Sequence, residues 1–163
     1  MWARILRGAA AGAAGTTALN AVTYLDMTLR GRGTSSTPER SVERLLRLVG
    51  LDVPGDDEAI RANRVSGLGA FLGIVTGVAV GASWGLADGL TDGALQRLPV
   101  PAGGLLVGTA ALLGANGPMV VLGVTDPRDW TVADWVSDLV PHLAFGLVVA
   151  FTYRATGDGR SAD

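Results

Sequence analysis

The residues best suited to chemistry are a carboxylate and an imidazole four positions apart, Asp138 and His142. In a helix this spacing puts both side chains on one face. A carboxylate beside an imidazole can hold a proton, orient the histidine or take part in metal binding. Because the chain has one His and no Cys, strong metal ligands are too few. We therefore expect no metal and no cofactor.

Other polar residues interrupt apolar stretches of the chain. If those stretches cross a bilayer, polar and ionisable groups within them should face the bundle interior or water. At 1.5 Å per helical residue, their depths point to one end of the bundle. We therefore predict a single polar cavity, lined by Asn20, Asp26, Asn116, Asp138 and His142. Two interpretations stay open: structural cross-links between helices, or a functional site.

Four segments must position these residues, and they carry almost no charge. Residues 8–25, 65–87 and 100–124 carry none, and 139–153 is interrupted by His142 alone. About 20 helical residues cross a bilayer core of roughly 30 Å. The pattern predicts an all-α bundle of four transmembrane helices, over about 5–29, 65–87, 100–124 and 131–153. Residues 1–163 would form one integral membrane domain, multi-pass in the cell (inner) membrane.

A secretory signal peptide is an alternative reading of the first segment. Arg4 and Arg7 would be its basic region, and the alanines could hold a cleavage site. The stretch is poor in leucine and continues past Asn20 to Leu25. We therefore favour a retained span.

The polar loop 30–64 contains a predicted amphipathic helix over about 38–49. Thr37 is the expected N-cap, Pro38 takes the first helical position, and Gly50 suits the stop. Apolar residues recur at helical spacing from Val42 onward. The helix would lie on the membrane surface or pack on the ends of the spans. A second helix, capped by Asp56 or Asp57, should run into the second span, and residues 155–163 should form a frayed tail.

Glycines recur at every fourth position of the second span. Small residues let membrane helices approach closely, so these glycines predict a continuous packing groove. The third span adds two more at the same spacing. The predicted packing residues are Gly69, Gly73, Gly77, Gly81, Gly85, Gly104 and Gly108. An intramolecular seam is favoured over a dimer interface.

The charge balance excludes some partners and suggests an orientation. Thirteen Arg against fifteen acids exclude a strongly basic nucleic-acid binder. With four spans, eight Arg lie on the side of the long loop and five on the other, so the positive-inside rule places that loop in the cytoplasm. The lipid bilayer is the expected partner, with a homo-oligomer or a larger membrane complex as the assembly.

Two stretches resemble known membrane proteins. Residues 8–20, with Gly8, Gly12, Gly15 and Asn20, resemble the opening span of uncharacterised actinobacterial four-span membrane proteins. Residues 123–143, with Trp135, Asp138 and His142-Leu143, are similar to the last span of the YagU-like inner-membrane family. The resemblance implies a membrane protein and singles out Asp138 and His142, but it implies no reaction.

These observations favour a non-enzymatic structural or accessory membrane component. The alternative is a small transport or proton-handling protein that uses the predicted polar cavity. A membrane enzyme has less support, because no nucleophile pattern such as Gly-x-Ser-x-Gly accompanies the Asp–His pair.

Overall fold

The computed structural model describes residues 1–158, which form five α-helices and one 3-10 turn. No strand occurs in this range, so the predicted all-α class is confirmed. The elements are α1 (Trp2–Arg30), α2 (Thr37–Leu48), α3 (Glu58–Leu90), α4 (Val100–Val121), η1 (Pro127–Asp129) and α5 (Val132–Asp158).

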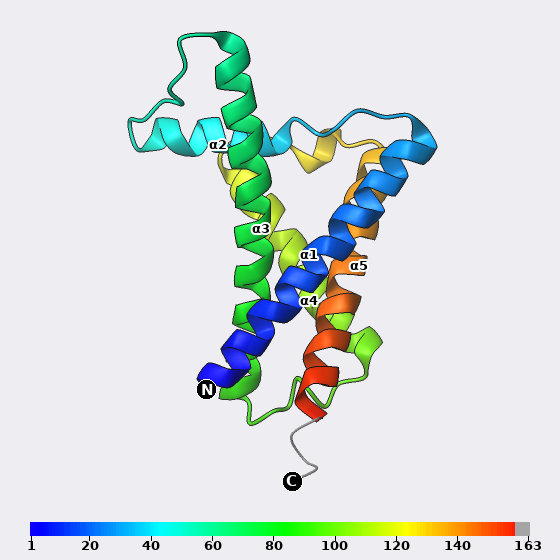
Figure 1. Ribbon diagram of the computed structural model, residues 1–163. Helices are drawn as coiled ribbons and strands as arrows, with labels where there is room; N and C mark the ends of the chain where they lie inside the picture. Colours follow the sequence, from blue (N-terminus) through cyan, green and yellow to red (C-terminus); the bar gives the residue numbers. More distant parts are fainter. Residues whose placement is uncertain (159–163) are drawn as a thin grey trace.

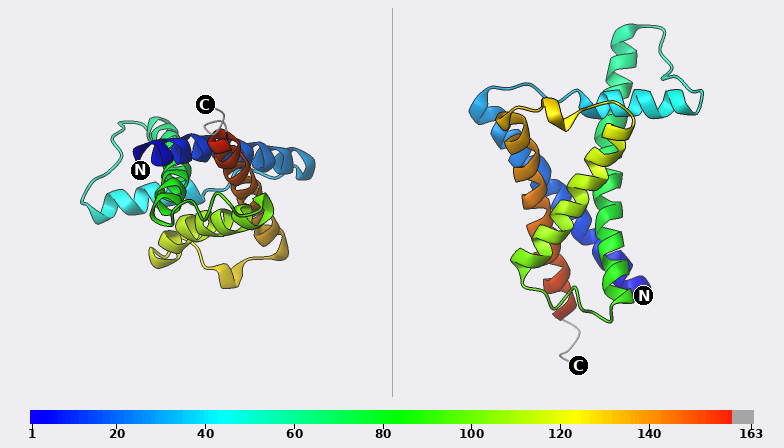
Figure 2. Two further views of the ribbon diagram at one scale, coloured as in Figure 1. Left: turned by 90° about the horizontal axis from the view of Figure 1, so that it is seen from below. Right: turned by 180° about the vertical axis from the view of Figure 1, so that it is seen from behind.

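The four long helices run alternately up and down (Figure 1). As a result, the start of α1 and the end of α5 lie at the same end of the molecule, which we call the terminal end. The opposite end carries α2 and the loop from α1; we call it the loop end. Seen from behind (Figure 2, right), α4 crosses in front of α3 and α5, while α1 crosses on the far side.

Three of the described helices, α3, α4 and α5, are long and apolar enough to cross a membrane. This is consistent with a multi-pass membrane protein. Three of the four predicted spans therefore correspond to helices that are long and apolar enough to cross a membrane. The fourth, α1, is not apolar enough. Its 29 residues suffice in length, but the Gly and Thr residues in its middle, together with Asn20, lower its mean hydropathy.

The small residues of α1 instead allow close packing on two sides. A Cβ at Gly8 or Gly12 would clash with the backbone carbonyl oxygen of Gly81 or Gly77 in α3. Gly15, about one turn further on, contacts side chains of α5. Small side chains here let α1 approach both neighbours at backbone distance, which increases dispersion contacts.

The predicted continuous groove on α3 is wrong in its first part. Gly77, Gly81 and Gly85 contact α1, but Gly73 is exposed and a Cβ there would meet nothing within 4 Å. Gly69 faces Pro38 of α2 instead of a long helix. Each step of four residues turns a helix about 40° beyond a full circle. Five such glycines therefore spread over too wide an arc to face one neighbour.

The glycines of α4 lie in its contact with α5. A Cβ at Gly104 would press on the backbone of Leu147, and one at Gly108 would approach the carbonyl oxygen of His142 at 2.8 Å. Gly146 of α5 completes this contact from the other side. The apolar core lies next to it, where all four long helices contribute Ala11, Trp84, Val107, Ala111, Phe145, Val149 and Tyr153.

The amphipathic helix α2 lies crosswise against α3 (Figure 1). Its Val42 is buried, and Glu43 forms an ion pair of 3.1 Å with Arg61. The expectation that Thr37 caps this helix is wrong. Thr37 is the first helical residue, and Ser36 precedes it without a side-chain cap. The predicted stop holds, because Gly50 takes the left-handed φ of 71° that favours glycine.

Two of the remaining helices begin with side-chain caps, and one end differs from the prediction. Asp57 caps α3 by accepting from the Ala59 amide at 2.8 Å, and α3 continues unbroken through the apolar run. Thr131 and Asp134 bond each other's backbone amides at 2.9 and 3.2 Å before α5. The predicted tail 155–163 begins too early, since α5 includes residues 155–158; residues 159–163 lie outside the described range.

Candidate functional site

Three of the five predicted cavity residues come together between α4 and α5. The Asn116 amide donates to Asp138 Oδ2 at 2.6 Å, which links the two helices. His142 Nδ1 lies 3.3 Å from Asp138 Oδ1 and 2.8 Å from the Asp138 backbone oxygen. The spacing of four residues therefore places the carboxylate and the imidazole on one face, as predicted.

This triad is only partly shielded. The side chains of Asp138 and His142 are 23% and 13% exposed. His142 also lines a small cavity of 150 Å³ between α4 and α5, together with Leu105, Gly108, Thr109, Leu112, Leu139 and Leu143. The walls are mainly apolar, so this cavity offers few groups that could bind a polar ligand.

Asp26 belongs to a different network, at the loop end between α1 and α5. Its carboxylate forms ion pairs with Arg30 at 2.7 Å and with Arg32 at 2.6 Å. Ser137 of α5 donates to Asp26 Oδ2 at 3.4 Å and also accepts from Arg30. We call this group the Asp26 cluster.

The prediction of one shared cavity therefore differs from the arrangement observed. Ser137 and Asp138 are neighbours on α5, but successive helical residues point about 100° apart. Ser137 faces α1, whereas Asp138 faces α4. Asn20 joins neither network, and within residues 1–158 its side chain makes no hydrogen bond that connects it to either.

A third polar cluster, outside the predicted cavity residues, lies at the terminal end. Its centre is Asp88 of α3, whose side chain is 0% exposed. The Tyr153 hydroxyl of α5 donates to Asp88 Oδ2 at 2.9 Å, and the Gln96 backbone amide donates to Oδ1 at 2.8 Å. Arg4 Nε and Arg7 Nη2 of α1 lie 3.7 and 3.9 Å from the same carboxylate.

Arg7 is held in this cluster by more than its charge. Its guanidinium lies over the Tyr153 ring, 3.9 Å from the centroid, and donates to Gln96 Oε1 at 2.6 Å. The cation therefore contacts the ring face, where the aromatic quadrupole is attractive. We call Asp88, Arg4, Arg7, Gln96 and Tyr153 the Asp88 cluster; it joins α1, α3 and α5.

A charge pattern could have revealed the Asp88 cluster. Asp88 directly follows the uncharged run 65–87, so it lies just beyond the predicted second span. In an up-and-down bundle, however, the start of the first helix and the end of the second meet at one end. Two arginines and one acid at those positions predict an ion pair across helices.

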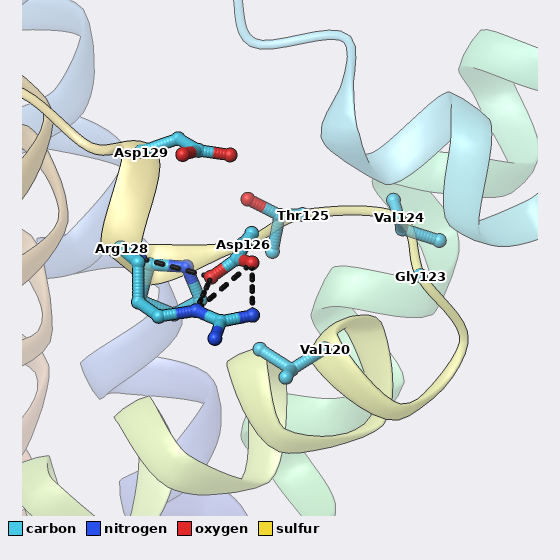
Figure 3. Close-up of a pocket in the computed structure, with 8 residues that line it drawn as sticks. Val120, Gly123, Val124, Thr125, Asp126, Arg128 and Asp129 are labelled. Carbon is cyan, nitrogen blue, oxygen red and sulfur yellow. Dashed lines mark hydrogen bonds and ion pairs between the residues drawn. The ribbon is translucent and has the colours of Figure 1, made fainter.

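An open hollow lies at the turn between α4 and α5 (Figure 3). It measures 710 Å³, is open to solvent and runs from Val120 to Asp129. Arg128 forms an ion pair with Asp126 at 2.7 Å. Hydrogen bonds from the Arg128 side chain lower the pKa of the Asp126 carboxyl from 3.8 to about 2. Both partners are exposed, so this pair is a local brace of the turn.

None of these clusters gathers a metal-binding set. Within residues 1–158, no three His, Cys, Asp or Glu side chains are placed to hold a metal ion. What the clusters do chemically is join helices: each fixes a carboxylate against a group on a neighbouring long helix.

The fold and these clusters define a helical protein with three candidate membrane spans. Comparisons with protein families, with curated proteins and with solved structures find no match to this chain.

Proposed function

We propose that α1 crosses the membrane together with α3, α4 and α5, which makes the protein a four-span membrane protein. Support comes from both ends of α1, because each is bonded to α5: Arg7 contacts Tyr153 at the terminal end, and Arg30 contacts Ser137 at the loop end. The 19 helical steps from Arg7 to Asp26 span about 28 Å at 1.5 Å per step, close to the thickness of a bilayer core.

On this basis, the protein is a non-enzymatic structural or accessory component of the cell (inner) membrane. The observation that carries the proposal is that three carboxylates of the long helices cross-link those helices. Asp26, Asp88 and Asp138 each accept a hydrogen bond from a side chain of another long helix. Intramembrane carboxylates that are satisfied in this way stabilise a bundle and leave little capacity for a reactant.

The resemblance to the YagU-like inner-membrane family belongs to the same proposal. Two residues that carry it, Asp138 and His142, take part in the cross-link between α4 and α5. A homo-oligomer or a larger membrane complex is the assembly that suits an accessory component.

Purification from native membranes in a mild detergent tests this function. We expect the protein in an assembly of fixed stoichiometry by native mass spectrometry. Proteoliposomes with a pH-sensitive dye inside should show no more proton flux than protein-free vesicles. Flux in the parent that is lost in Asp138→Asn would overturn the proposal.

A proton-handling function is the second candidate, and one observation favours it. Asp138 and His142 remain 23% and 13% exposed, and His142 borders the 150 Å³ cavity. An imidazole and a carboxylate in contact can exchange a proton with water that reaches them. The same flux measurement distinguishes this candidate from the accessory function.

A further inference from the structure

The two charge types on α2 point in different directions. Its acids face α3: Glu43 pairs with Arg61 at 3.1 Å, and Glu39 accepts from Ser66 at 3.3 Å. Its arginines, Arg40, Arg44 and Arg47, are exposed, and within residues 1–158 the structure gives them no hydrogen bond or ion pair. Intramolecular contacts thus hold the acids against α3 and leave the three cations unpaired.

An apolar strip occupies another face of the same helix. Leu45 and Val49 follow the buried Val42 at spacings of three and seven residues, yet they are 41% and 67% exposed. Leu48 at the end of the helix is 64% exposed. A short helix with unpaired arginines on one face and uncovered apolar side chains on another has the composition of an interfacial membrane helix.

The contacts of α2 along α3 indicate the depth at which α2 would lie in a bilayer. Pro38 of α2 packs on Gly69, and Glu39 bonds Ser66. These residues of α3 lie at the first turns of its uncharged run 65–87, where the hydrocarbon core of a bilayer would begin. Because α2 lies crosswise to α3 there (Figure 1), it would lie in the plane of the headgroups if α3 spans the bilayer.

We propose that α2 is an interfacial helix that binds anionic phospholipid headgroups through Arg40, Arg44 and Arg47. Its Leu45, Leu48 and Val49 enter the boundary between headgroups and acyl chains. Anionic lipid suits the site because three unpaired cations on one face attract a negative surface, and guanidinium groups bind phosphate oxygens through two hydrogen bonds. The proposal rests on membrane insertion of α3 and applies equally to an accessory and to a proton-handling protein.

The chain has no cysteine, so a single engineered one can carry a probe. Val49→Cys and Arg44→Cys are each labelled with an environment-sensitive fluorophore in the full-length protein. The labelled proteins are reconstituted in phosphatidylcholine vesicles with and without one quarter phosphatidylglycerol. Quenching by lipids with a nitroxide just below the headgroup is compared with quenching by aqueous iodide.

We expect the label at Val49 to be quenched by the nitroxide lipid and protected from iodide, more strongly when phosphatidylglycerol is present. The label at Arg44 should remain accessible to iodide. On the Val49→Cys background, the triple change Arg40→Gln, Arg44→Gln and Arg47→Gln should abolish the effect of phosphatidylglycerol. The matched change of the same three residues to Lys should retain it, because the charge remains.

Several results would overturn the proposal. Equal nitroxide quenching in the two lipid mixtures would show that the arginines do not respond to anionic headgroups. Persistence of the phosphatidylglycerol effect in the Gln triple variant would assign it to another surface. Protection of Val49 from both quenchers would show that protein, such as a second copy, covers this face. Since the arginines have no partner in the described chain, an unchanged thermal melting curve of the Gln variant verifies folding.

Discussion

At the scale of single residues, Asp138 distinguishes a structural from a functional role. Its Oδ2 accepts a hydrogen bond from the side-chain amide of Asn116, and its Oδ1 lies beside the imidazole of His142. An Asn side chain can keep the hydrogen bond across helices, so Asp138→Asn should change the melting temperature little. Asp138→Leu leaves Asn116 and His142 without this partner and should destabilise by about 1–3 kcal/mol.

Thermal unfolding in detergent, followed by circular dichroism, measures both Asp138 variants. Equal destabilisation by Asn and Leu would mean that the negative charge itself holds α4 and α5 together. A wild-type melting curve for Asp138→Leu would remove the cross-link role altogether.

Substitution of the buried Asp88 should lower the free energy of unfolding more than substitution of an exposed acid near it. Asp88→Asn places an amide among Arg4, Arg7 and Tyr153, which now surround a carboxylate. Losing the charge that pairs with the two arginines should cost about 1–3 kcal/mol of unfolding free energy. The matched control is Asp92→Asn, four residues along the chain, exposed and at a positive φ that Asn tolerates.

Chemical unfolding in mixed micelles gives both free energies. The control should lie within about 0.5 kcal/mol of the parent, as for most exposed substitutions. Equal losses for the two variants would contradict a special role of the Asp88 cluster.

At the scale of helices, the glycines of α3 provide a matched pair. Gly77 lies against Thr16 and Phe145, whereas a side chain at Gly73 would meet nothing within 4 Å. Gly77→Leu should force α1 and α3 apart and destabilise by at least the roughly 1–3 kcal/mol typical of overpacking. Gly73→Leu carries the same change in propensity and hydropathy and should express and melt like the parent.

Expression level and melting temperature in detergent compare these two variants directly. If Gly73→Leu is the more damaging one, the exposed face of α3 is itself a contact with another protein. If neither variant has an effect, the α1–α3 contact tolerates separation.

At the scale of the whole molecule, the number of spans can be measured with single cysteines. Ala3, Ser36 and Ala94 are exposed, with Ser36 at the loop end and the other two at the terminal end. We expect an impermeant thiol reagent to label Ala3→Cys and Ala94→Cys from outside intact cells. Ser36→Cys should require permeabilised membranes, because the arginine-rich loop favours the cytoplasm.

Labelling of Ala3→Cys and Ser36→Cys from the same side would show that α1 does not cross the membrane. If Ser36→Cys is labelled from outside and the other two variants only after permeabilisation, the four spans remain and the orientation is inverted. A position that labels only in detergent would lie buried in an assembly.

Sequence patterns along single helices were sufficient for the all-α class and for most helix positions. A run without charge, a capping acid such as Asp57 and a stop such as Gly50 act within one or two turns, so they can be recognised without knowing the neighbours. The Asp138–His142 contact follows for the same reason, since four residues make one helical turn.

Contacts between helices depended on the tertiary structure. Sequence spacing does not show that Ser137 faces α1 while Asp138 faces α4. The residues predicted to line one cavity therefore belong to two separate networks in the structure. Spacing alone also put Gly73 in the predicted groove, although α1 crosses α3 without reaching it. The predicted second span ended before Asp88, which is buried among three helices. Helix periodicity determines which residues share a face, but the crossing angles and order of the packed helices decide what each face meets.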